Sequence, residues 1–112
     1  ANFESEGHAA EAFSTLASWA GVRIERIVSH GNATPPGEWY DQAWDEWVLV
    51  VAGAAELLVE HEERSRHLIP GDYVLLRRHV RHRVLSTDPE HPTVWLAIHV
   101  GEGSDTEDGG ET

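Results

Sequence analysis

The feature that most constrains the fold of this chain is a succession of short β-rich runs, separated by turn residues, that begins after residue 21. The runs are rich in valine, isoleucine, leucine and tryptophan, whereas glycine, proline, asparagine and aspartate gather between them, where they favour turns. Many short strands with turns between them, and no second helix, predict an all-β sandwich or barrel. The expected strands cover residues 22–29, 46–51, 54–60, 66–69, 73–76, 82–86 and 93–100.

The N-terminal segment has a different pattern, and we predict a short helix there. Apolar residues recur there every three to four positions, as on one face of a helix, at Phe13, Leu16, Ala17 and Ala20. Gly21 suits the position that ends a helix. Within a single-domain length of 112 residues, this predicts a helical segment at 1–21 and one β domain at 22–100.

The last residues, 101–112, form a Gly-rich acidic tail that we expect to be disordered, because it has almost no apolar surface to bury. The formal charge of the chain is −12, and it is still −7 once the five acids of the tail are removed. An acidic domain is repelled by the phosphate backbone, so we expect no nucleic-acid partner. The five tail acids are Glu102, Asp105, Glu107, Asp108 and Glu111.

The composition also limits where the protein works and which metals it could hold. The sequence has no apolar run of membrane-spanning length and no signal-peptide pattern, so we expect a cytoplasmic protein with no membrane partner. It has no cysteine, which excludes disulfides and thiolate ligands. A bound metal would therefore need imidazole, carboxylate, amide or water ligands, which suit transition metals such as iron, manganese, nickel or zinc.

Two spaced motifs give a more specific indication. Glu46 precedes Gly53 by seven positions, and the turn Pro70-Gly71-Asp72 is followed by a strand and then by His82. Here the chain resembles the cupin superfamily, whose first motif runs G-x5-H-x-H-x3,4-E-x6-G and whose second contains a P-G-D turn with a histidine about ten residues later. The resemblance covers about residues 22–100. Within the superfamily, the chain resembles small single-domain cupins of bacteria. It implies a jelly-roll β-barrel, here with a short N-terminal helix and a disordered acidic tail.

The resemblance implies a metal held by two histidines of the first motif, its glutamate and the histidine of the second. Glu46 takes the glutamate position and His82 the second-motif histidine. The histidine pair falls on Tyr40 and Gln42 with a spacer of three, or on Trp39 and Asp41 with a spacer of four. Neither alignment supplies a histidine, so the usual ligand set is incomplete.

Strand parity selects between the two alignments. Alternate side chains of a strand share a face, so Tyr40, Gln42, Trp44 and Glu46 would all face the barrel interior if the strand is regular. We therefore predict that one divalent transition metal (Zn, Fe, Mn or Ni) is bound by Gln42, Glu46 and His82. His79 completes this set if the loop before His82 folds inward.

Other residues are predicted to contact a ligand rather than a metal. Trp95 and His99 alternate with Ala97 on the last expected strand, and Tyr40 shares the face of Gln42. His99 is an alternative metal ligand, and both His79 and His99 could instead bind a carboxylate of the ligand. The structural alternative is that Glu46 and His82 are satisfied core residues and that the tryptophans pack the core or an interface.

Residues 77–83 contain half of the arginines of the chain. They either pair with neighbouring acids on the surface or rim the pocket, where Arg81 would recognise an anionic small molecule. The leading hypothesis is a metal-dependent cupin that acts on or binds such a molecule inside the barrel. The alternative is a non-catalytic sensor or carrier without metal, and a third possibility is a structural β-barrel. Resemblance to cupins also implies a homodimer.

Overall fold

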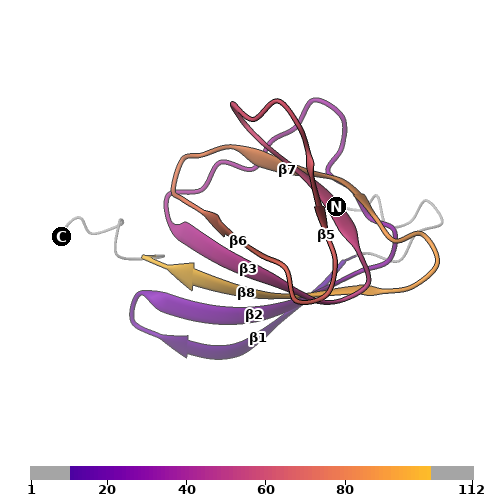
Figure 1. The fold of residues 1–112 in the computed structure, drawn as a ribbon. Coiled ribbons are helices and arrows are strands. Elements are labelled where there is room, and N and C mark those ends of the chain that lie inside the picture. The colour runs from indigo at the N-terminus through magenta and orange to yellow at the C-terminus, as the bar shows by residue number, and fades with distance from the viewer. Residues whose placement is uncertain (1–10, 102–112) are drawn as a thin grey trace.

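The computed structural model describes residues 11–101, which form eight strands in two antiparallel sheets that face each other (Figure 1). No helix occurs in this part of the chain, so none of its segments is a helix able to cross a membrane. The five-stranded sheet has the order β1-β2-β8-β3-β6, and the three-stranded sheet has the order β5-β4-β7. The strands are β1 Ala12–Trp19, β2 Val22–Ser29, β3 Asp45–Ala52, β4 Ala55–Val59, β5 Arg66–Leu68, β6 Tyr73–Leu76, β7 His82–Thr87 and β8 Thr93–Val100.

The core lies between the two sheets, because one face of each central strand is apolar. In β3 and β8 every second residue is buried, so Val48, Val50 and Ala97 meet the apolar face of β4. Leu57 of β4 is almost completely buried against this face. This alternation is the pattern from which the strands were predicted, and it leaves one face of each sheet for solvent.

The predicted N-terminal helix is wrong, because residues 12–19 form strand β1. This strand pairs with β2 from Ala12↔Val28 to Trp19↔Val22, and its register shifts at Leu16. The backbone of β1 finds its hydrogen-bond partners in β2. The helical spacing of apolar residues could not predict this pairing. Gly21, expected to end the helix, lies in the hairpin turn with φ of 77°, a conformation that glycine adopts easily. Residues 1–10 of the predicted helical segment, and tail residues 102–112, lie outside the described residues.

The predicted all-β architecture is confirmed, but the two sheets do not close into a continuous barrel. The connection between β2 and β3 runs beside β7. There Thr34 N–H donates to the Val84 carbonyl at 2.9 Å, and Val84 N–H donates to Thr34 Oγ1 at 2.9 Å. The connection therefore supplies hydrogen-bond partners to the edge of β7. It takes the place of the neighbouring strand that would otherwise close a barrel.

Both motif turns have a structural role beside β3. Gly53 has a φ of 83°, and a Cβ atom at this position would lie 2.6 Å from the Thr93 Cα and 2.7 Å from the Pro92 carbonyl oxygen. In the second turn, Gly71 N–H donates to the Val50 carbonyl at 2.8 Å, and Val50 N–H donates to the Asp72 carbonyl at 2.9 Å. The two turns therefore fix the end of β3 that lies away from Glu46.

Candidate functional site

A cavity of about 350 Å³ lies between the two sheets, within the size range of small-molecule sites in proteins. Its lining combines four aromatic rings, three carboxylates, one guanidinium and two imidazoles with an apolar floor. Six of the eight residues predicted from the sequence line this cavity: Tyr40, Gln42, Glu46, His82, Trp95 and His99.

The register of the large sheet brings the polar residues of the cavity together. His99 on β8 lies opposite Glu46 on β3 and opposite Arg23 on β2. Two positions along, Glu25 lies opposite Ala97, the smallest inward-facing side chain of β8. The cavity therefore has a polar row above a floor that includes Val48, Leu57 and Trp95.

Tyr40 and Gln42 reach the cavity through backbone hydrogen bonds with β7 and with the turn that precedes it. Tyr40 N–H donates to the His82 carbonyl at 2.8 Å and His82 N–H donates to the Tyr40 carbonyl at 3.1 Å, while their rings stack 5.4 Å apart. The Gln42 carbonyl accepts a 2.7 Å hydrogen bond from His79 N–H. Tyr40, Gln42, Trp44 and Glu46 all line the cavity as parity predicted, although only Glu46 belongs to β3.

Both ring nitrogens of His99 are engaged by protein groups. Trp44 Nε1–H donates to His99 Nδ1 at 2.8 Å, so this nitrogen carries a lone pair and the ring proton is on Nε2. Nε2–H faces Glu25 Oε1 at 3.3 Å, and Arg23 Nη1–H donates to Glu25 Oε2 at 2.8 Å. His99 therefore serves as a link in a buried polar network, with no lone pair left for a metal.

His82 has one ring nitrogen that is free to act. Its Nδ1–H points to the Val80 carbonyl at 3.4 Å, and no residue in the described part of the chain hydrogen-bonds to Nε2. Burial lowers the pKa of His82 below its ordinary value, and the nearby carboxylate of Glu46 offsets part of that shift. At neutral pH His82 therefore presents a lone pair at Nε2.

Glu46 is the most unusual residue of the cavity. Its side chain is buried, with a relative exposure of 7%, yet within residues 11–101 it makes no hydrogen bond or ion pair. Burial of a carboxylate is costly unless a cation or hydrogen-bond donor accompanies it. The Glu46 carboxylate lines the cavity, and its oxygens are not among the fully buried atoms without a partner, so they are accessible to a ligand there.

The fit of a metal to this site depends on Gln42. Residues 11–101 contain no group of three or more histidine, aspartate or glutamate side chains arranged to hold a metal ion. Because His99 and Glu25 are engaged, the uncommitted donors in the cavity are Glu46, His82 Nε2 and the amide oxygen of Gln42. These one-nitrogen, two-oxygen donors match the chemistry of a divalent ion, with amide oxygen as the weakest ligand.

His79 and Arg81, also predicted as site residues, do not line the cavity. His79 has a left-handed backbone with φ of 62°, and its Nδ1 lies 2.9 Å from Asp41 Oδ1 on the surface. Arg81 lies near the same carboxylate, with its Nε 3.7 Å from Asp41 Oδ2, and 4.0 Å from Glu60 Oε1. The turn before His82 thus directs both side chains outward.

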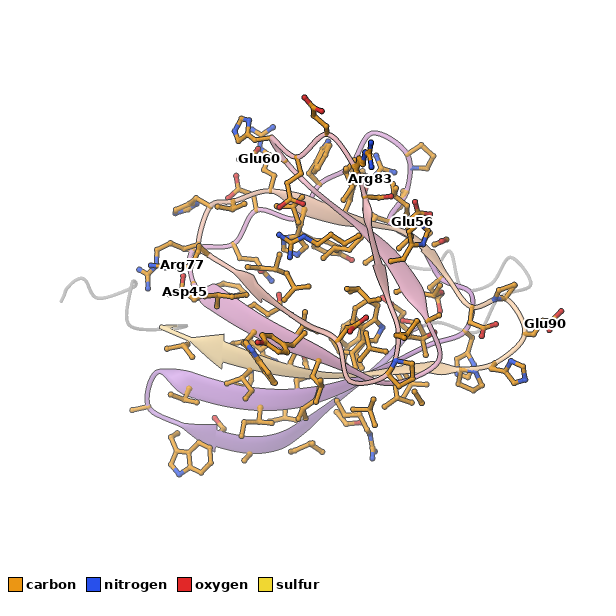
Figure 2. The ribbon with its side chains drawn as sticks, in the orientation of Figure 1. Asp45, Glu56, Glu60, Arg77, Arg83 and Glu90 are labelled. Atoms are coloured by element: carbon orange, nitrogen blue, oxygen red, sulfur yellow. The ribbon has the colours of Figure 1, made fainter. Side chains whose placement is uncertain are left out.

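Of the other arginines of residues 77–83, Arg77 and Arg78 lie on the surface and Arg83 is half-buried. Arg77 and Arg78 each place Nε 3.7 Å from Asp45 Oδ1, and Figure 2 shows Arg77 beside Asp45 at the edge of the sheet. Arg83 lies over the Trp39 ring, 5.8 Å from its centroid. Pairing with neighbouring acids, the simpler of the two sequence interpretations, describes Arg77, Arg78 and Arg81.

Sequence reasoning missed the residues that complete the polar network, Arg23 and Glu25, and it assigned no polar role to Trp44. The available signal was weak: Arg23 and Glu25 alternate with Val22 and Ile24 in a strand whose inward face could not be chosen from its own residues. Glu11 was missed as well; its Oε2 accepts a 2.6 Å hydrogen bond from Ser29 Oγ at the other end of the cavity.

Two facing antiparallel sheets around a small polar cavity, with a Glu-x6-Gly motif and a Pro-Gly-Asp turn, define a small-molecule-binding jelly roll of the cupin type. The chain belongs to the cupin domain family, whose model matches residues 27–99. None of the curated proteins compared with the chain matches it.

Solved structures support the same assignment. A candidate mannose-6-phosphate isomerase from Ralstonia eutropha JMP134 is 48% identical, with 84% of this chain and 87% of that chain covered and a TM-score of 0.82. A cupin superfamily protein from Desulfitobacterium hafniense DCB-2 is 17% identical over 81% of this chain and 77% of that one, with a TM-score of 0.66. The polyketide cyclase RemF from Streptomyces resistomycificus is 17% identical over 80% and 64%, also with a TM-score of 0.66. The last two show a shared fold alone.

Proposed function

We propose that this cupin binds a small molecule in the cavity between its sheets and holds one divalent transition metal there through Gln42, Glu46 and His82. The observation that carries the proposal is the buried carboxylate of Glu46, which has no partner in the described chain. A bound cation would offset the cost of burying that charge. Zn, Fe, Mn and Ni are the candidate metals, since all accept mixed imidazole and oxygen ligands.

The rest of the site would keep these donors in place. The chain of contacts from Trp44 through His99 and Glu25 to Arg23 fixes the wall next to Glu46, because each polar group in it has a partner. Stacking of Tyr40 on His82 limits rotation of the imidazole. When bound, the metal would supply Lewis-acid activation of a substrate oxygen.

A second candidate is a metal-free binding protein, and one observation favours it. His99 is the second imidazole of the cavity, and both of its nitrogens are occupied, which leaves a single histidine among the potential ligands. In that case Glu46, His82 and Gln42 would hydrogen-bond the small molecule directly.

Metal analysis and thermal unfolding distinguish the two candidates. If the proposal holds, protein purified without added metal and then titrated with Zn²⁺, Mn²⁺, Ni²⁺ or Fe²⁺ is stabilised by several degrees, since a ligand that binds only the native state raises the melting temperature. Less than about a tenth of an equivalent of metal after purification, together with no thermal shift for any of these ions, would support the metal-free candidate.

The variant His82→Gln should abolish the shift, and His79→Gln is its matched control. Both remove one imidazole from the same segment, but only His82 lines the cavity. Gln42→His should strengthen metal binding, because imidazole is a better ligand than an amide oxygen. Loss of the shift in the His79→Gln variant, or no response to Gln42→His, would contradict the proposed ligand set.

A further inference from the structure

The cavity has an acidic lining that bears on which small molecule it accepts. Glu11, Glu25 and Glu46 line it together with one guanidinium, that of Arg23, which gives a formal charge of −2 with neutral histidines. The whole chain carries −12, so the surrounding field has the same sign. A negative potential in a pocket concentrates cations and repels anions.

The cationic groups that an anionic ligand would need are engaged elsewhere. Arg23 is paired with Glu25 at 2.8 Å inside the cavity. Arg77, Arg78 and Arg81 pair with Asp45, Asp41 and Glu60 on the surface. All eight basic residues of the chain are arginines, so no lysine is present to bind phosphate. The reason for expecting an anionic ligand was that arginines of residues 77–83 would rim the pocket, and none of these arginines lines the cavity.

Aromatic rings lie close to the unpartnered carboxylate of Glu46. The Trp44 ring meets the ring of His99 edge-on at 6.0 Å, and His99 is the cross-strand neighbour of Glu46. Tyr40 stacks on His82, and the charge of Glu46 acts on both of these side chains. A carboxylate in a cavity that aromatic rings also line attracts an organic cation in two ways, through its own charge and through the ring quadrupoles.

We infer that the cavity, when no metal occupies Glu46, binds an organic cation with an amine or quaternary ammonium group, and that it discriminates against phosphorylated ligands. The positive group lies at Glu46, and its carbon substituents contact Tyr40 and Trp44. The inference rests on the proposed function, that this cavity binds a small molecule. It goes beyond that function by assigning the chemical class of the small molecule.

Calorimetric titration with three probes of similar shape tests the ligand class. Choline is the cation, 3,3-dimethylbutanol is its uncharged isostere and 3,3-dimethylbutanoate is the anion, and inorganic phosphate is a fourth probe. We expect choline to bind about tenfold more tightly than the uncharged isostere, and the two anions not to bind. The inference would be overturned if the uncharged isostere bound as tightly as choline, if either anion bound more tightly than choline, or if choline did not bind.

Two variants locate the charge responsible. Glu46→Gln keeps the shape of the side chain and should remove most of the preference for choline over its isostere. Glu90→Gln removes one carboxylate from the turn at the far end of the molecule (Figure 2), outside the cavity, and should leave the preference unchanged. An equal loss in both variants would show a general field effect and would contradict a site at Glu46.

Zn²⁺ separates failure of this inference from failure of the proposed function. Because both cations need Glu46, Zn²⁺ should weaken choline binding, and binding of choline that is indifferent to saturating Zn²⁺ would refute its placement there. If Zn²⁺ stabilises the protein but choline does not bind, only the ligand class is wrong. If neither binds, both proposals fail.

Discussion

The indole Nε1–H of Trp44 donates a 2.8 Å hydrogen bond to Nδ1 of His99, a residue 55 positions further along the chain. An indole can only donate, so this contact determines which nitrogen of His99 carries the proton. That proton in turn faces Glu25 at 3.3 Å. This hydrogen bond therefore makes His99 part of the cavity wall and leaves it no lone pair for a metal.

Trp44→Phe should destabilise the protein by about 1–3 kcal/mol, because it leaves the buried Nδ1 of His99 without a donor. Trp47→Phe is the matched control, since Trp47 stacks on Tyr73 on the outer face of the sheet and makes no hydrogen bond through its side chain in the described chain. Denaturant unfolding measures both variants. A loss in Trp47→Phe as large as that in Trp44→Phe would argue against a special role for the indole hydrogen bond.

We expect His82 to titrate below its ordinary pKa of 6.5 in the folded protein, because burial disfavours its charged form. Below pH 6.5 the unfolded chain then binds the proton more readily than the folded one, so stability falls as the pH decreases from 6.5 toward the folded pKa. Glu46→Gln should lower the pKa of His82 further, since the carboxylate raises it. Nitrogen NMR shifts of the imidazole report this titration, and a His82 pKa at or above 6.5 would contradict the prediction.

Gly53→Ala should be clearly more destabilising than Gly37→Ala, although both glycines have a φ of 83°. At Gly37 a new Cβ would meet nothing within 4 Å, so only the backbone strain of about 1 kcal/mol is added. At Gly53 the same atom would overlap the backbone of Pro92 and Thr93, and the total loss should reach about 2–4 kcal/mol. Equal losses in urea unfolding would show that the close approach has no energetic weight.

We expect the protein to form a homodimer through the outer face of the five-stranded sheet. Tyr73 and Leu75 are exposed there, at 64% and 53%, beside the Trp47 ring that stacks on Tyr73. An apolar patch of this kind on a sheet favours association. Light scattering should give twice the chain mass of 12.5 kDa, and Leu75→Glu should give the monomer mass.

Leu85→Glu is the control for that experiment, since Leu85 is an exposed residue of β7 on the other sheet. Its variant should stay dimeric. A monomer in all three proteins would exclude the interface, and a Leu75→Glu variant that remains dimeric would show that the contact lies elsewhere.

Local sequence patterns were sufficient for the bounds of three strands. Residues 22–29, 73–76 and 93–100 were predicted with the bounds that β2, β6 and β8 have, because alternation and turn residues are properties of neighbouring positions. The same period of two placed Gln42 and Glu46 at the cavity together. The helical spacing at residues 13–20 was misleading, since nothing local reveals that β2 offers a pairing edge to this segment.

The sequence by itself therefore determined the all-β class, the cupin motifs and the residues that share an inward face, because each follows from spacing along the chain. The tertiary structure decided which polar residues meet. The register of β2, β8 and β3 brought Arg23, His99 and Glu46 into one row, and the turn before His82 directed His79 and Arg81 outward. Strand register and loop direction depend on contacts between segments that are distant in the sequence. The same contacts decide that both nitrogens of His99 have hydrogen-bond partners and that the carboxylate of Glu46 has none in the described chain.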